Sequence, residues 1–106
     1  MSDEISAYFH IGQIIKHQRF GYRGVIYDVD PVFSNSDEWY QQMATSKPSK
    51  DKPWYHILVD NSTHTTYVAE RNLASDNQGE PIYNPLINQL FTEFKDGRYV
   101  LDVARN

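Results

Sequence analysis

Apolar and polar residues alternate in short runs along the first third of the chain, and turn-forming residues separate these runs. The run over 25–29 places Val25, Tyr27 and Val29 on one face, which is the two-residue period of a half-buried strand. An earlier apolar run precedes it across a glycine-containing loop. The pattern predicts a β-hairpin with strands over 13–17 and 23–29. Pro31 then ends the hairpin, because proline cannot donate a ladder hydrogen bond.

The middle of the chain continues the strand pattern. Both faces of the run over 54–59 are largely apolar, which is typical of a central strand. A polar turn at 60–62 predicts that the chain returns as a strand over 64–69. A single helical turn over 70–73 then leads to a short last strand.

Two helices are predicted outside these strands. Ser36 followed by two acids is typical of a capped helix start, and it predicts a short inserted helix. Asn84 followed by Pro85 predicts a second start, and the apolar positions Leu86, Ile87, Leu90 and Phe91 follow helical spacing as far as Phe94. We therefore expect a mainly β fold, a small barrel, with a short inserted helix and a C-terminal helical extension.

Length and composition indicate one small domain. The chain has 106 residues, so we expect a flexible tail over 1–8 and a single domain over 9–106. It has no cysteine, which excludes disulfides and thiolate metal sites and is compatible with a reducing cytoplasm. The acidic N-terminus does not resemble a signal peptide, and no apolar run reaches membrane-spanning length. We expect a soluble cytoplasmic protein, and association with the nucleoid is an open alternative.

The charge is unevenly distributed along the chain. The formal net charge is −4, whereas a general DNA-coating protein carries an excess of lysine and arginine. Lys16, Arg19 and Arg23 concentrate positive charge in the first hairpin, and the region 54–106 has seven acids against four bases. Any nucleic-acid face is therefore expected in the first half, and the second half is expected to face away from the nucleic acid or to serve another partner.

Three separated blocks carry a resemblance to a known family. They read FHIGQIIKHQRFGYRGVIYDVDP over 9–31, PWYH over 53–56 and YVAERNL over 67–73. In this order they resemble the YccV-like family of bacterial hemimethylated-DNA-binding proteins, to which heat shock proteins of the HspQ type belong. The resemblance extends over nearly the whole chain.

The resemblance implies a fold and two functions. The implied fold is an SH3-like barrel, and the implied assembly is a homotrimer. The first function is binding of hemimethylated double-stranded DNA, linked to control of the replication initiator. The alternative is an adaptor or specificity-enhancing factor for an ATP-dependent protease such as Lon. The acidic net charge favours the adaptor and the family favours DNA, so both remain open.

Charge and aromatic content suggest where such partners bind. The candidate DNA contacts are Lys16, His17, Arg19, Tyr22 and Arg23, although a hairpin with ordinary solvated charges is the alternative. For a protein partner, the candidates are the apolar residues Leu86, Ile87, Leu90 and Phe91.

The sequence does not indicate an enzyme or a cofactor. His56 and His64 flank a turn and are expected to face each other across a hairpin, but a third ligand is not evident, so we expect no metal ion. Asp28 and Asp30 share a strand face, and we expect them to cap the strand end and to pair with a base such as Arg23. Ser62 beside His64 lacks the glycine elbow of a nucleophile motif.

Overall fold

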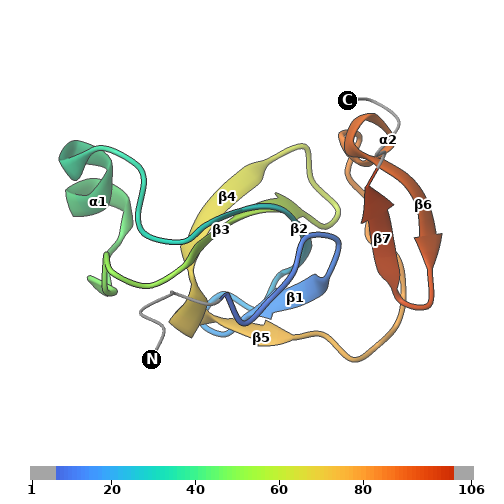
Figure 1. The fold of residues 1–106 in the computed structure, drawn as a ribbon, viewed down its shortest axis with the longest axis horizontal. Helices are drawn as coiled ribbons and strands as arrows, with labels where there is room; N and C mark the ends of the chain where they lie inside the picture. Colours follow the sequence, from blue (N-terminus) through green and yellow to red (C-terminus); the bar gives the residue numbers. More distant parts are fainter. Residues whose placement is uncertain (1–6, 102–106) are drawn as a thin grey trace, which may run out of the picture.

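The computed structural model describes residues 7–101, and its central element is a curved antiparallel sheet (Figure 1). The order of its five strands is β4-β3-β2-β1-β5. Their bounds are Ile14–His17 for β1, Arg23–Asp30 for β2, Trp54–Val59 for β3, Thr65–Ala69 for β4 and Leu73–Ser75 for β5. The predicted mainly β fold and all five of these strands are confirmed.

The sheet is not closed by hydrogen bonds within residues 7–101. Strands β4 and β5 form its two edges, and the single turn η1 (Glu70–Asn72) connects them along the chain. The closure expected of a barrel is therefore absent from the strand pairing of this region, although Figure 1 shows the sheet curving around a central space.

Apolar side chains from all five strands fill the concave side of the sheet. Ile15, Ile26, Tyr55 and Ile57 lie fully buried in one cluster there. Phe9 closes this cluster: its backbone N–H donates to the Tyr55 hydroxyl at 3.1 Å. The chain is therefore already part of the core at residue 9, and residues 1–6 of the predicted tail lie outside the described residues.

Strand β3 is central, as its two apolar faces predicted. Tyr55 and Ile57 face the concave cluster, while Leu58 and Trp54 enter two separate clusters on the convex side. Helix α1 (Asp37–Met43) covers Trp54 with Tyr40. Ser36 caps α1 as predicted, because its Oγ accepts a hydrogen bond from the Trp39 N–H at 3.1 Å.

The alternation predicted for the second strand is interrupted by a β-bulge. The register of β2 against β3 shifts between Ile26 and Asp28, so Tyr27 is an extra residue. Before the bulge Ile26 faces the concave core, and after it Val29 does so. The two-residue period therefore predicted the strand but assigned Val29 to the wrong face, because a bulge inverts the alternation beyond it.

The C-terminal extension is a hairpin rather than a helix. Helix α2 is a single turn (Ile87–Leu90), and Phe91 begins β6 (Phe91–Lys95), which pairs with β7 (Arg98–Leu101). Asp96 and Gly97 have positive φ angles of 55° and 80°, the conformation of a two-residue hairpin turn. The prediction of a helix to Phe94 was wrong because this Asp-Gly pair joins two strands and does not end a helix.

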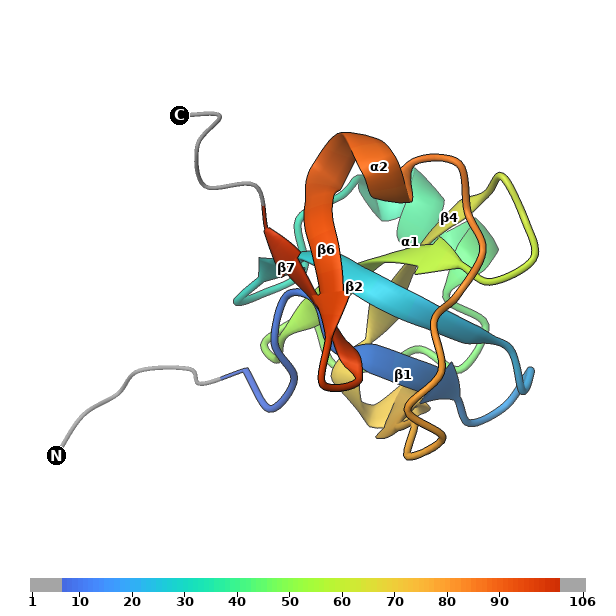
Figure 2. The same ribbon diagram turned by 90° about the vertical axis from the view of Figure 1, so that its right-hand side faces the viewer.

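The β6–β7 hairpin covers the convex face of the sheet (Figure 2). Phe91 and Tyr99 pack on Ile14, Val25 and Leu58. Asn84 holds the preceding segment in place, because its side-chain amide donates to the carbonyls of residues 59 and 64. Its Oδ1 accepts from the Leu86 N–H, but the helix itself begins at Ile87.

Candidate functional site

A groove of about 370 Å³ lies between the β1–β2 loop and helix α1, with the edge strand β4 along its floor. Its walls are unusually aromatic for so small a domain. The aromatic side chains that line it are Phe20, Tyr22, Tyr27, Trp39, Trp54 and Tyr67. The groove thus offers flat apolar surfaces suited to ring or methyl groups.

The β1–β2 loop is held by a buried histidine. Nδ1 of His17 accepts hydrogen bonds from the backbone N–H groups of Arg19 and Phe20, both at 3.1 Å. Burial, assisted by the charge of Arg19, lowers the pKa of His17, which favours the neutral ring that this acceptor role requires. The ring also stacks under Phe20 with centroids 4.7 Å apart. His17 therefore shapes the loop from inside.

Hydrogen bonds join this loop to β4 on one side and to η1 and β5 on the other. The hydroxyls of Tyr22 and Thr66 share a hydrogen bond of 2.8 Å across the base of the groove. On the other side, the Gln18 N–H donates to the carbonyl of Asn72 at 2.8 Å. The loop tip is consequently fixed at its sides while Phe20 remains 72% exposed.

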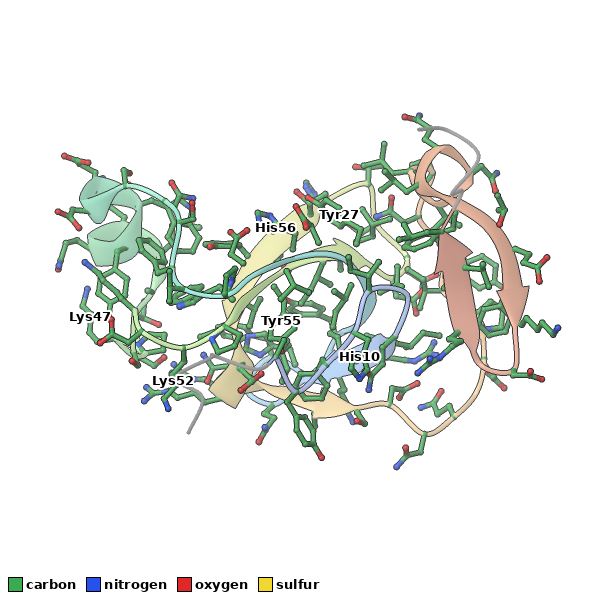
Figure 3. All side chains as sticks on the ribbon, in the orientation of Figure 1. His10, Tyr27, Lys47, Lys52, Tyr55 and His56 are labelled. Atoms are coloured by element: carbon green, nitrogen blue, oxygen red, sulfur yellow. The ribbon has the colours of Figure 1, made fainter. Side chains whose placement is uncertain are left out.

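Three positive side chains line the groove or adjoin residues that line it. Arg19 lines the groove directly. Arg71 in η1 donates from Nη2 to the carbonyl of Ser46 at 2.7 Å, which brings it against the α1–β3 loop. Lys47 is next to Ser46 in that loop and is exposed, and Figure 3 shows it at the end of the molecule that carries α1. We call Arg19, Lys47 and Arg71 the rim cations.

The five predicted DNA contacts lie in different environments. Lys16 and Arg19 are exposed, and Tyr22 lines the groove. His17 is buried beneath the loop. Arg23 lies at the loop end of β2, and its side chain forms ion pairs with Asp60 and Asp76. Of the five, Arg19 and Tyr22 lie where they can touch a ligand in the groove.

One end of the groove is acidic. His56 lines this end, and its Nε2 is hydrogen-bonded to Oδ2 of Asp30 at 3.0 Å. The Tyr67 hydroxyl donates to the same oxygen at 2.6 Å. Burial and this hydrogen bond raise the pKa of Tyr67, so it remains a neutral donor. Asp28 lies beside them, directly across the ladder from His56.

Two expectations about these residues were wrong. Arg23 does not pair with Asp28 or Asp30, because it begins β2 whereas Asp30 ends it. His56 and His64 do not face each other, because His56 pairs with Tyr67 in the ladder. His64 instead lies opposite Val59, whose N–H donates to the His64 carbonyl.

The predicted protein-partner residues pack against the convex core. Phe91 is buried, and Leu86, Ile87 and Leu90 are partly buried against the same cluster. Their apolar spacing is accounted for by this packing, and their role in binding a partner stays a prediction.

The rim residues outside the first hairpin were not predicted. Arg71 is an isolated cation in the sequence and Lys47 belongs to a loop with three lysines, and the contact of η1 with the α1–β3 loop brings these two segments together. Trp39, on helix α1, was not predicted to lie beside the first hairpin. The clustering of aromatics in three separate segments was the available signal.

The fold and groove define a small β-rich domain with an aromatic groove that has cations beside it. Residues 7–98 match the family model described as hemimethylated DNA-binding protein, YccV-like, so the chain belongs to the YccV-like family. The match contains every groove residue named above. Within residues 7–101, none of the helices combines the length and the apolar character needed to cross a membrane.

Proposed function

We propose that this protein is a non-enzymatic DNA-binding protein that contacts a methylated duplex through the groove and the β1–β2 loop. The carrying observation is the exposed Arg19-Phe20 tip of the β1–β2 loop, next to an aromatic groove. The description of the family supports hemimethylated DNA as the ligand.

The exposed tip of the β1–β2 loop is the part of the domain proposed to enter the major groove of DNA. Methyl groups on bases project into that groove. Phe20 is the most exposed aromatic of the loop, and its ring is held by stacking on His17. A preorganised apolar ring at the tip contacts a methyl group without an added ordering cost.

The rim cations suit the phosphates on either side of such a contact. Arg19 adjoins Phe20, Arg71 lies in η1 next to the loop, and Lys47 follows the groove residue Ser46. Phosphate contacts position a protein on a duplex, and base contacts provide the specificity. In this proposal the rim cations contact phosphates, and Phe20 contacts the methylated base.

Fluorescence anisotropy with three matched duplexes tests the proposal. They carry no methyl group, N6-methyladenine on one strand, or N6-methyladenine on both strands. Burial of one methyl group contributes about 0.8 kcal/mol, so we expect about fourfold tighter binding to the duplex methylated on one strand. Phe20→Ala should remove this preference, and its exposure predicts little loss of folding stability.

Tyr83→Ala is the matched control. Tyr83 is 67% exposed, similar to Phe20, but it does not line the aromatic groove. We expect the control to keep both affinity and preference. Equal affinity of the wild-type protein for all three duplexes would reject methyl recognition, and a loss of binding in Tyr83→Ala alone would move the interface away from the loop.

Finer roles are also proposals. The family resemblance supports a role in the control of the replication initiator. It also supports an SH3-like barrel as the fold. An adaptor role for an ATP-dependent protease is supported by exposed apolar residues on the C-terminal hairpin, Val100 and Leu101. Assembly as a homotrimer is a further proposal, and light scattering on the full chain at micromolar concentration tests it.

A further inference from the structure

Three potential metal ligands meet at the acidic end of the groove. One carboxylate oxygen each from Asp28 and Asp30 and one ring nitrogen of His56 all lie within 4.8 Å of one another. We propose that these three residues bind a divalent transition-metal ion such as Zn²⁺. The proposal replaces the expectation of no metal, which considered only the pair His56 and His64.

The β-bulge in β2 creates this arrangement. Without the bulge, Asp28 would lie on the same face as Ile26, which is fully buried in the concave core. The extra residue Tyr27 turns Asp28 and Asp30 to the convex face, where His56 lies directly opposite Asp28. Bulges of this kind commonly re-aim side chains at functional sites.

The spacing of two ligand atoms already suits a shared ion. Nitrogen and oxygen ligands lie about 2.0–2.2 Å from Zn²⁺, so two ligands of one ion are about 3.0–3.5 Å apart. Nε2 of His56 and Oδ2 of Asp30 are 3.0 Å apart. Asp28 is exposed, and although its Oδ1 accepts a hydrogen bond from the Val29 N–H at 2.9 Å, its second carboxylate oxygen has no such partner within residues 7–101 and is available as a ligand.

Neighbouring aromatic residues orient two of the ligands. Tyr67 donates a hydrogen bond to Oδ2 of Asp30 at 2.6 Å, and its ring packs 4.5 Å from the His56 ring. Tyr27 flanks the other side of His56, with ring centroids 5.7 Å apart (Figure 3). Outer contacts that fix a carboxylate and an imidazole are typical of metal sites.

The ligand types select the class of ion. One imidazole and two carboxylates suit Zn²⁺, Fe²⁺ and Mn²⁺, while Mg²⁺ and Ca²⁺ prefer oxygen ligands alone. Zn²⁺ binds such sites more tightly than Mn²⁺. The His56 and Asp30 side chains are 30% and 23% exposed, so water can complete the coordination.

A cation here would also change the charge of the groove. Asp28 and Asp30 place negative charge at one end of a surface that we propose faces phosphates. A bound divalent ion offsets this repulsion. This consequence rests on the proposed function, whereas the metal site itself does not.

Isothermal titration of metal-free, untagged protein with ZnCl₂ tests the site without DNA. We expect one Zn²⁺ per chain, at least tenfold weaker binding in Asp28→Asn and in His56→Gln, and 10- to 100-fold weaker binding in Tyr67→Phe. MnCl₂ should bind more weakly, and millimolar MgCl₂ should not displace Zn²⁺.

His64→Gln is the matched control, because His64 is exposed and lies outside the cluster. Its affinity for Zn²⁺ should equal that of the wild-type protein. Nitrogen-15 NMR of the histidine rings gives a second measurement, in which Zn²⁺ should shift the Nε2 signal of His56. Unchanged affinity in Asp28→Asn, or loss of binding in His64→Gln, would overturn the proposal, whatever the protein does with DNA.

Discussion

Nε of Arg23 donates a hydrogen bond to Oδ2 of Asp76 at 3.0 Å, and this contact ties the start of β2 to the segment after β5. Nη1 of the same guanidinium lies 3.3 Å from Asp60, and Nη2 donates to the carbonyl of Glu80 at 2.7 Å. The side chains of Arg23 and Asp76 are only 15% and 4% exposed. Arg23 is therefore part of the structure of the domain and is not available to a phosphate.

The first prediction concerns this ion pair. Arg23→Gln leaves the shielded carboxylates of Asp60 and Asp76 without their cation, and it should lower the free energy of unfolding by about 3 kcal/mol. Urea denaturation followed by circular dichroism measures this loss. Arg19→Gln is the control, because an exposed arginine should change stability by less than about 0.5 kcal/mol. Equal stability of the two variants would contradict a structural role for Arg23.

The second prediction concerns the contact between Gly12 and Tyr99, which attaches the C-terminal hairpin to the sheet. Gly12 has φ of +89°, and a Cβ there would lie 2.1 Å from the carbonyl oxygen of Tyr99. The Tyr99 N–H also donates to the Gly12 carbonyl at 2.8 Å. Gly12→Ala should therefore cost about 3 kcal/mol or more, since backbone overlap adds to strain of about 1–2 kcal/mol.

Gly79→Ala isolates the strain from the overlap. Gly79 has φ of +73°, but a Cβ added at this position would meet no other atom within 4 Å. Its substitution should cost only the strain of about 1–2 kcal/mol. Thermal melts that rank the two alanine variants equally would show that the hairpin can move away from Gly12.

Local pattern predicted the strands well because each strand has a full apolar face and a clear turn at its end. The central position of β3 followed from Trp54, Tyr55 and Leu58 occupying both of its faces. The bulge was not predictable, because the sequence of β2 alternates without interruption and only its pairing with β3 reveals Tyr27 as an extra residue.

The site was only partly predictable because tertiary contacts decide which charges are free. Arg19 and Arg23 are residues of the same type in the same predicted hairpin. Arg19 lines the groove, whereas Arg23 is paired with two carboxylates. Arg71 lies in the acidic half, and its contact with Ser46 brings it to the groove. The count of charges in each half of the chain therefore did not predict which cations lie beside the groove.

The third prediction concerns the pH dependence of stability. The pKa of His17 is lowered in the folded protein, so between that value and the ordinary histidine pKa the unfolded chain binds more protons. The stabilisation is fully present above the ordinary histidine pKa, and it is lost as the pH falls through the lowered pKa of His17. Protonation of Nδ1 also removes the acceptor for the N–H groups of Arg19 and Phe20, which should cost about 1 kcal/mol.

Thermal melts at pH 7.5 and pH 5 compare the wild-type protein with His17→Asn, which retains a side-chain acceptor but does not titrate. Other titrating groups are common to both proteins, so the difference between their pH dependences isolates His17. We expect the wild-type protein to lose more stability on acidification. Parallel losses would show that the loop does not depend on a neutral His17.

The last prediction concerns the salt dependence of DNA binding. Each phosphate contact releases counterions and contributes about −0.9 to the slope of log affinity against log salt concentration. Arg19, Lys47 and Arg71 together predict a slope of about −2.7 for one chain, and replacing any one of them with glutamine should reduce its magnitude by about 0.9.

Lys95→Gln and Arg98→Gln are matched controls, because these exposed cations lie on the β6–β7 hairpin, at the opposite side of the molecule from α1 (Figure 1). Anisotropy titrations between 50 and 200 mM salt give the slope for each variant, compared at equal oligomeric state. If the hairpin controls reduce the slope and the rim variants do not, DNA contacts the β6–β7 hairpin and the aromatic groove is not its binding site.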